Sequence, residues 1–365
     1  MVTEVTDIPQ EPVMYIAIGL FTIFLLVLIL PFKSRRVEEN LEPFFLIMGI
    51  LAVTISGVWS FGLIEEAVIA PVSIGGLPIG IFQVVLIAGL VIYKFNQQIY
   101  SGLTKAMDKL GVAKFIFIMI LVLGLTSSLI SVIVAAVILV EIIAALPLSR
   151  EKKIDLTVIT CFAVGFGAAL TPVGEPLSTI AVAKLSKPPY NADFLFLFRL
   201  LGEYIIPAVF ALAVFGAIYA GRHSGEAQMP EYTESLRTVI RRAIRVYMFV
   251  AALMLLGGGL APLVDWYIIK IPAQVLYWVN MISAVLDNAT LAAAEIDPQL
   301  EISQIKSALI ALIISGGMLI PGNIPNIVAA GRIGITMNQW ARRGVPLGLV
   351  LMVIFFAILM VEGVH

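Results

Sequence analysis

Long apolar runs separated by short charged loops make up most of the chain. The first run, Val13–Phe32, has the roughly 20 residues that a helix needs to cross a bilayer, and a basic cluster from Lys33 to Arg36 follows it. Because basic loops stay on the cytoplasmic side, we expect the N-terminus to lie outside. Apolar runs over 44–64 and 76–93 predict two more spanning helices, so residues 1–113 are expected to form an N-terminal scaffold.

Two later apolar regions carry helix-breaking residues in matching patterns. Each has two prolines four residues apart behind a group of glycines. Proline lacks a backbone donor and glycine permits conformations closed to other residues, so the helices are predicted to unwind near 171–176 and 321–326. The residues assigned to these breaks are Gly165, Gly167, Pro172, Gly174, Pro176, Gly316, Gly317, Pro321, Gly322 and Pro325. Paired broken helices in a membrane protein indicate a transporter binding site.

The charges predict a hairpin before the first break. Basic loops flank residues 114–147 on both sides, so both ends of this region are expected in the cytoplasm. We therefore predict a re-entrant hairpin that enters the membrane and returns, with Ser127 and Ser128 at its polar tip and Ser131 on the returning limb. Polar backbone at such a tip must be buried against protein or an ion.

The second half of the chain repeats this order in the opposite orientation. Residues 272–295 predict a hairpin entered from outside, with its polar tip between Ser283 and Thr290. The predicted fold is an all-α polytopic membrane protein of eight spans, built from two inverted repeats that each hold a re-entrant hairpin and a broken transmembrane helix. Repeat 1 is assigned to 114–220 and repeat 2 to 246–365.

Residues 221–245 join the two repeats and are the most charged part of the chain. Arg237, Arg241, Arg242 and Arg245 follow one another at roughly helical spacing. We interpret this segment as a cytoplasmic connector helix, with a site for lipid headgroups or a regulatory site as the alternative.

Composition supports a multi-pass protein of the cell (plasma) membrane. Hydrophobic residues make up 60% of the 365 residues and charged residues 13%, and the mean hydropathy is +1.04. Soluble chains are roughly half apolar and a quarter charged. The expected partners are membrane lipid and small inorganic ions, and a net charge of −1 argues against nucleic acid. Both termini are predicted to lie outside.

The motifs resemble those of the ion transporter superfamily, which includes NhaD-type sodium/proton antiporters, arsenite permeases and sodium-coupled dicarboxylate carriers. The resemblance rests on Thr171-Pro-Val-Gly-Glu-Pro176, on the second break from Ile320 to Asn326, and on Ser283-Ala-Val-Leu-Asp-Asn288. It covers 114–186 and 272–340, and the Asp-Asn pair is most similar to the NhaD branch. The chain departs from the pattern in its first tip, which has neither Asn nor Asp, and in its second break, which reads Pro-Gly-Asn-Ile-Pro. The resemblance implies that tips and breaks meet near the midplane, and it allows a homodimer.

Two carboxylates fall on these central elements, Glu175 in the first break and Asp287 at the second tip. A charged side chain within a membrane costs about 2.5 kcal/mol or more and is a functional candidate by default. The alternative for each is a structural hydrogen bond, and Asn323 and Asn326 have helix capping as their alternative role. The predicted ion- and proton-binding residues, with Na⁺ as the metal, are Asp287, Asn288, Glu175, Ser127, Ser128, Ser131, Thr171, Ser283, Thr290, Asn323 and Asn326.

The remaining carboxylates are weaker candidates. Glu141 is expected to pair with Arg150 or a nearby lysine, and Glu203 with Arg199 one turn before it. For Glu295, a solvated hairpin end is favoured over a role on an entry path.

The leading hypothesis is a secondary Na⁺(Li⁺)/H⁺ antiporter, because a buried carboxylate binds either a metal ion or a proton. No cofactor is expected beyond the transported Na⁺ and H⁺. A sodium-coupled anion (carboxylate or oxyanion) symporter of the same architecture is the alternative, although neither break and neither tip contains Arg or Lys. The chain has neither a Gly-x-Gly-Asp nor a His-Glu-x-x-His protease motif, so an enzyme is not expected.

The hairpin assignment predicts where the loops flanking 114–147 lie. In Lys105→Cys and Lys152→Cys variants, an impermeant thiol reagent should label both positions from the cytoplasmic side only. Labelling from opposite sides would remove the first hairpin and with it the inverted repeat.

Overall fold

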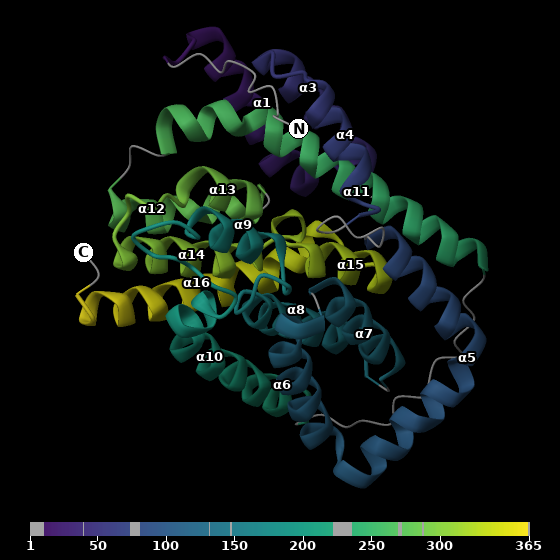
Figure 1. Cartoon of the computed structure of the whole chain (residues 1–365). Helices are drawn as coiled ribbons and strands as arrows, with labels where there is room; N and C mark the ends of the chain where they lie inside the picture. Colours follow the sequence, from purple (N-terminus) through teal and green to yellow (C-terminus); the bar gives the residue numbers. More distant parts are fainter. Residues whose placement is uncertain are drawn as a thin grey trace.

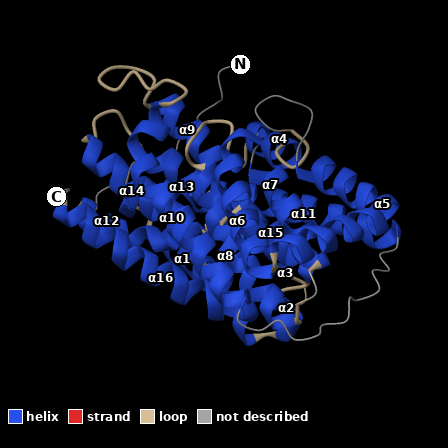
Figure 2. Cartoon of the chain, turned by 90° about the horizontal axis from the view of Figure 1, so that it is seen from below, coloured by secondary structure: helices blue, strands red, loops and turns tan. Residues whose placement is uncertain are grey.

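The computed structural model describes residues 11–363 apart from 39, 74–80, 131, 147, 222–235, 269–271 and 287. In these ranges the chain forms helices and connecting loops with no strand (Figure 2). The helices of the first half are α1 (Met14–Lys33), α2 (Arg35–Glu38), α3 (Leu41–Ser56), α4 (Phe61–Ile69), α5 (Ile81–Leu110), α6 (Val112–Ile130), α7 (Val132–Ala145), α8 (Arg150–Ala168), α9 (Pro176–Lys184) and α10 (Phe196–Gly221). The second half has α11 (Leu236–Leu263), η1 (Val264–Ile268), α12 (Ala273–Val279), η2 (Asn280–Ala284), α13 (Asn288–Glu295), α14 (Ile302–Gly316), η3 (Ile320–Gly322), α15 (Ile324–Ile333) and α16 (Met337–Val361).

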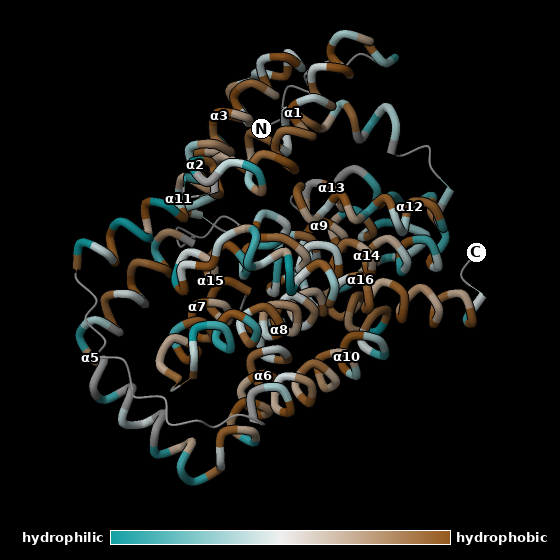
Figure 3. Tube along the Cα trace, turned by 180° about the vertical axis from the view of Figure 1, so that it is seen from behind, coloured by the Kyte–Doolittle hydropathy of each residue, from teal (hydrophilic) through white to brown (hydrophobic). Residues whose placement is uncertain are grey.

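Apolar surfaces confirm the prediction of a membrane-embedded helical protein. Within the described residues, five helical segments are long and apolar enough to cross a membrane: α1, α6, α10, the α11–η1 segment and α16. Large apolar side chains such as Phe21, Phe210 and Val353 lie exposed on the outside of these helices, and hydrophobic positions run along most of the tube in Figure 3. In water such surfaces would be unfavourable, whereas lipid solvates them.

The N-terminal helices form a group with α11. Helices α1, α3 and α4 all pack against α11 and lie together along the upper edge of Figure 1. The helix predicted over 44–64 is interrupted: Gly57 ends α3 with a φ of 73°, and the Ser60 hydroxyl caps α4 by accepting the Leu63 N–H at 3.1 Å. The arginines predicted to form a separate connector are instead the first turns of α11, since the helix runs unbroken from Leu236 into the apolar segment.

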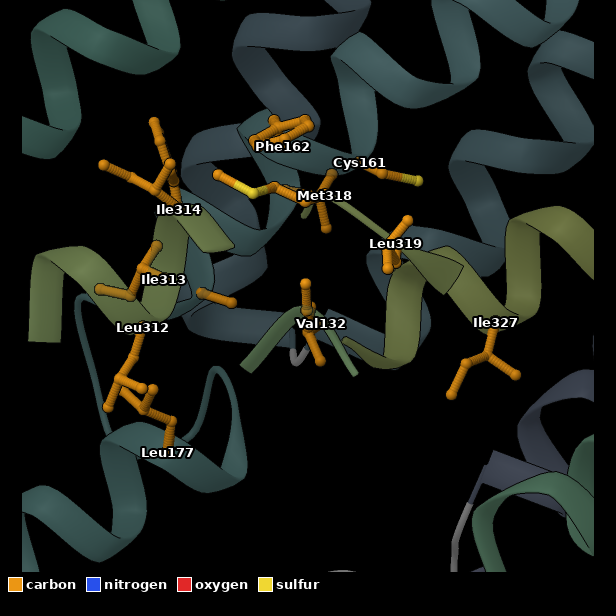
Figure 4. Close-up of a cluster of buried hydrophobic side chains, with 14 of the residues drawn as sticks. Val132, Cys161, Phe162, Leu177, Leu312, Ile313, Ile314, Met318, Leu319 and Ile327 are labelled. Atoms are coloured by element: carbon orange, nitrogen blue, oxygen red, sulfur yellow. The ribbon is translucent and has the colours of Figure 1, made fainter. Parts of the chain in front are cut away.

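Helices α8 and α14 form the centre of the molecule. Every residue of α8 from Leu156 to Ala168 is buried, as is every residue of α14 from Ser307 to Gly316. Helices α6, α7, α10, α14, α15 and α16 all contact α8. In Figure 4, the apolar side chains of Phe162, Met318 and Leu319 lie beside one another in this core. The two helices that lead into the predicted breaks are therefore also the most enclosed.

Both predicted breaks are confirmed. Helix α8 ends at Ala168 and α9 begins at Pro176, while α14 ends at Gly316 and α15 begins at Ile324 after the short 3-10 turn η3. In each case a proline occupies the first turn of the second helix, where its missing N–H removes no helical hydrogen bond.

The glycines act differently from the prediction, because none of those assigned to the breaks has a positive φ. They permit close approach instead. A Cβ on Gly167 would lie 1.6 Å from the Gly124 carbonyl oxygen, so α6 and α8 touch at a point where no larger residue fits.

The first hairpin tip is not where the sequence placed it. Thr126, Ser127 and Ser128 lie within α6, which continues to Ile130. Each hydroxyl donates to a carbonyl of the preceding turn, at 2.6–2.9 Å, so these polar residues need no break in the helix. Before the second predicted tip the backbone forms the 3-10 helix η2 over Asn280–Ala284, and α13 starts at Asn288.

Because α6 and α8 touch at Gly167, adding one methyl group there should destabilise the protein. Gly167→Ala should lower the free energy of unfolding by about 1–3 kcal/mol, because the two helices must move apart. Gly102→Ala is the matched control: a Cβ on this exposed α5 residue meets nothing within 4 Å, so the change should be neutral or stabilise by up to about 1 kcal/mol. Denaturant unfolding of the protein in detergent would check both, and equal midpoints would contradict the contact.

Candidate functional site

The first break is fixed to the end of α6 and the start of α7. The Thr171 hydroxyl donates to the Ser128 carbonyl at 2.6 Å, and the Val132 N–H donates to the Gly174 carbonyl at 2.7 Å. Further along α8, the Ser127 hydroxyl is 2.9 Å from the Val164 carbonyl oxygen. Of the predicted ligands in this region, Thr171 ties the unwound segment to α6, with the Ser128 carbonyl as its acceptor. The Ser128 hydroxyl donates within α6 to the Leu125 carbonyl, and the Ser127 hydroxyl lies between α6 and α8.

The second break is held by its own amide side chains. Asn323 is the N-cap of α15, and its Oδ1 accepts the Ile324 N–H at 2.8 Å, so the capping alternative is correct for this residue. Asn326 donates from Nδ2 to the carbonyls of Gly316 and Leu319, each at 2.8 Å. These carbonyls lie at and beyond the end of α14, where the helix itself supplies no partner.

A cluster of polar side chains surrounds the end of α14. The Ser315 hydroxyl donates to the Asn280 carbonyl at 2.7 Å, and the Ser283 hydroxyl lies 3.4 Å from the Leu312 carbonyl oxygen. Asn288 lies on the other side, with its Nδ2 3.3 Å from the position of a Cβ on Gly316. The structure therefore places Ser283 and Asn288 beside the end of α14, where the second break begins.

Glu295 joins this cluster, and its expected solvated position is wrong. Its side chain is 6% exposed, and Oε2 accepts a hydrogen bond from Asn280 Nδ2 at 2.8 Å. Glu295 lies at the end of α13, two helical turns after Asn288 and so on the same face. That spacing was visible in the sequence, whereas nothing there indicated Asn280, which α12 and η2 carry into place.

Several buried polar atoms of this region have no hydrogen-bond partner among the described residues. They are Ser178 Oγ, Asn280 Oδ1, Asn288 Nδ2, Glu295 Oε1 and Asn326 Oδ1. Buried polar groups ordinarily have a protein, water or ion partner, and four of these five atoms are oxygens of the kind that hard cations prefer. Within the described residues no three His, Cys, Asp or Glu side chains come together as metal ligands, so a cation bound here would rely on amide and hydroxyl oxygens beside the carboxylate.

Glu175 is buried at the start of α9. Its side chain is 3% exposed, and its extended backbone forms the N-cap of the helix. The positive end of a helix dipole favours a negative charge at this point. Because α9 packs against α13, the helix that has Glu175 as its N-cap and the helix that ends at Glu295 are neighbours.

The two halves of the chain interlock. Helix α9 of the first half packs against α13 of the second, and α15 of the second half packs against α7 of the first. The second break also rests directly on α8: Cys161 Sγ is 3.7 Å from the Pro325 carbonyl oxygen, and Asn323 Nδ2 lies 3.0 Å from a Cβ position on Gly165. Helices that lie far apart in the sequence, on both sides of the two breaks, thus meet in one buried region.

Three predicted ligands are not placed by the structure. Asp287 and Ser131 lie outside the described residues, and so does the side chain of Thr290. Their assignment to the ion site remains a prediction from the sequence.

An ion-pair network connects three helices beside this region. Arg332 of α15 donates from Nε and Nη2 to the two carboxylate oxygens of Glu141 on α7, each at 2.7 Å. Arg242 of α11 lies 3.5 Å from the same carboxylate, and the side chains are about 10% exposed. The expected pairing of Glu141 with Arg150 or a nearby lysine is therefore wrong, because the actual partner is 191 residues away in sequence.

The expected pair of Glu203 with Arg199 is also wrong. Glu203 lies 3.6 Å from Lys306, while Arg199 pairs with Asp193 at 2.7 Å. In both cases tertiary contacts override the pairing that sequence spacing favoured.

These features define a helical multi-pass membrane protein whose two broken helices meet in a buried polar region. The chain belongs to the family described as "Protein of unknown function (DUF1646)", which matches residues 17–362 and so covers both broken helices. No curated protein matches the chain.

The Glu141–Arg332 pair predicts strong and coupled effects on stability. Glu141→Leu and Arg332→Leu should each lower the free energy of unfolding by about 3 kcal/mol, because each breaks a buried, doubly hydrogen-bonded ion pair. The double variant should lose less than the sum of the two. The exposed pair Asp193–Arg199, with side chains 61% and 57% exposed, is the control and should contribute less than about 1 kcal/mol. Additive losses at Glu141 and Arg332 in unfolding experiments would contradict the coupling.

Proposed function

We propose that the protein is a secondary active transporter that exchanges Na⁺ (or Li⁺) for H⁺, with its ion site where the two broken helices meet. The main support for this proposal is that the short helices after the two breaks pack across the halves, and that buried oxygens without a hydrogen-bond partner among the described residues lie around the end of α14. Backbone unwound at membrane depth is tolerated where it lines a binding site or cavity. Paired breaks of this kind surround the coupling ions in carriers built from inverted repeats.

The helix order supports two repeats related by such a symmetry. Helices α6, α7, α8, α9 and α10 correspond in order to α12–η2, α13, α14, α15 and α16. The contacts correspond as well, since α6 and α7 pack on α8 while α12, η2 and α13 pack on α14. We assign α6–α7 and α12–α13 as the two hairpins, and the exchange of α9 and α15 between halves is what a two-fold relation through the centre produces.

The chemistry follows from the residues around α14. Oxygens at the C-terminal end of a helix favour a cation, and the carboxylate of Glu295 can hold either a proton or, with Asn280 and Asn326, a sodium ion. Asp287 would add a second carboxylate, as the sequence predicts. Competition of Na⁺ and H⁺ for one carboxylate is sufficient for exchange, because the site then carries one or the other on each crossing.

A sodium-coupled anion symporter is the second candidate. Each break also presents a helix N-terminus, at Pro176 of α9 and Ile324 of α15, and helix N-termini favour anions. The buried Glu175 at the first of these positions disfavours an anion there, so we place the cation exchanger first.

Transport in proteoliposomes tests the proposal. An outwardly directed pH gradient, acidic inside, should drive Na⁺ uptake by the wild-type protein without any added anion. Glu295→Gln and Asp287→Asn keep size and hydrogen-bonding capacity but remove titration, so both should abolish this uptake while the protein still folds. Asp297→Asn is the matched control, because the exposed Asp297 side chain accepts the Gln299 N–H at 2.8 Å, a bond that asparagine can keep.

Two outcomes would contradict the proposal. Normal pH-driven Na⁺ uptake by both carboxylate variants would show that these groups carry no protons. Na⁺ uptake that requires a carboxylate or oxyanion, and ignores the pH gradient, would favour the symporter.

A further inference from the structure

The first turns of α11 carry two stripes along one exposed face. Leu236, Ile240 and Ile244 repeat every four residues and are 46%, 43% and 54% exposed. Arg237, Arg241 and Arg245 follow each of them by one position and therefore form a basic stripe directly beside the apolar one. Alternating apolar and basic rows of this kind suit the boundary between lipid tails and headgroups.

A basic cavity of about 450 Å³ opens on the other side of the same arginines. It lies between α3, α11 and α15, and Arg241, Arg242, Arg245 and Arg332 all contribute to its wall. Glu42 is the one acidic residue in the lining. Among the described residues Arg241 has no ion-pair partner, and Arg245 is 3.8 Å from Glu42. The lining is therefore positively charged as a whole.

We propose that this place binds an anionic phospholipid. Its phosphate would lie in the basic cavity against Arg241 and Arg245. These two arginines line the cavity and also belong to the basic stripe on the exposed face of α11. Its acyl chains would run along Leu236, Ile240 and Ile244. A soluble anion would use the arginines alone, whereas a lipid accounts for the charged and the apolar stripe together, and anionic headgroups attract arginines at a membrane surface.

The position of the cavity connects such a lipid to the broken helices. Its wall includes Ile320 of η3 and reaches along α15 to Arg332, which is bonded to Glu141. A bound headgroup would therefore contact α11 and α15 at once and hold the second broken helix against the scaffold. This inference rests on the cavity and the α11 face, and it stands or fails independently of the proposed ion exchange.

Lipid binding can be measured on the full chain in neutral detergent. Native mass spectrometry with added phosphatidylglycerol should give a dissociation constant for the wild type, and phosphatidylcholine should bind more weakly. Arg241→Gln/Arg245→Gln should weaken phosphatidylglycerol binding by about thirtyfold, since two arginines near a headgroup are lost. Ile240→Ser/Ile244→Ser should also weaken it. Arg199→Gln/Arg342→Gln, which removes two exposed arginines on α10 and α16, is the matched control and should bind like the wild type.

Competition with inorganic phosphate distinguishes a lipid from a soluble anion. Phosphate at the same concentration should not displace phosphatidylglycerol if the apolar stripe contributes to binding. Displacement by phosphate, together with full binding by the Ile240→Ser/Ile244→Ser variant, would overturn the proposal in favour of a soluble anion. Wild-type affinity in the Arg241→Gln/Arg245→Gln variant would overturn it outright. If that variant does not fold, the binding measurement is repeated with Arg241→Gln alone, which removes one of the two charges. Arg241→Lys/Arg245→Lys, which keeps both charges, then serves as its folded reference.

Discussion

Unwound backbone in the middle of an apolar protein must find hydrogen-bond partners, and the rest of this structure is arranged to supply them. At the first break the partners come from α6 and α7, through Thr171 and Val132. At the second they come from Asn323 and Asn326, which bond the ends of the two half-helices. The short helices that follow the breaks pack across the two halves of the chain, α9 on α13 and α15 on α7. The hydrogen-bonded breaks and the short helices that cross between the halves together form the buried centre.

The buried carboxylates of the centre have two kinds of partner. The Glu141–Arg332–Arg242 network joins α7, α15 and α11 at one side of the centre, and its carboxylate lies between two arginines. Around the end of α14, by contrast, Glu295 has an amide as its partner, from Asn280. A buried carboxylate bonded by a neutral donor can take up a cation or a proton, whereas one held by an arginine cannot do so without breaking a strong pair. This difference is why we place ion exchange at Glu295 and assign a structural role to Glu141.

Local sequence signals predicted the membrane class and both breaks, because proline and long apolar runs act within a few residues. They failed where the outcome depends on contacts across the fold. The serines of the first tip remain helical because their hydroxyls bond within the same turn, which a polar pattern alone does not reveal. Glu295 was expected in solvent, and it is buried because η2 brings Asn280 to it. The partner of Glu141 lies in the other half of the chain, so no local spacing could identify it.

The central claim is that one set of buried oxygens near the end of α14 binds either Na⁺ or a proton. The most direct measurement is proton release when NaCl is added to the purified protein in weakly buffered detergent, with choline chloride as the control. We predict that Na⁺ releases protons and that its apparent affinity improves as the pH rises, because fewer protons then compete for the carboxylate. Na⁺ binding without proton release, or with an affinity independent of pH, would contradict the account.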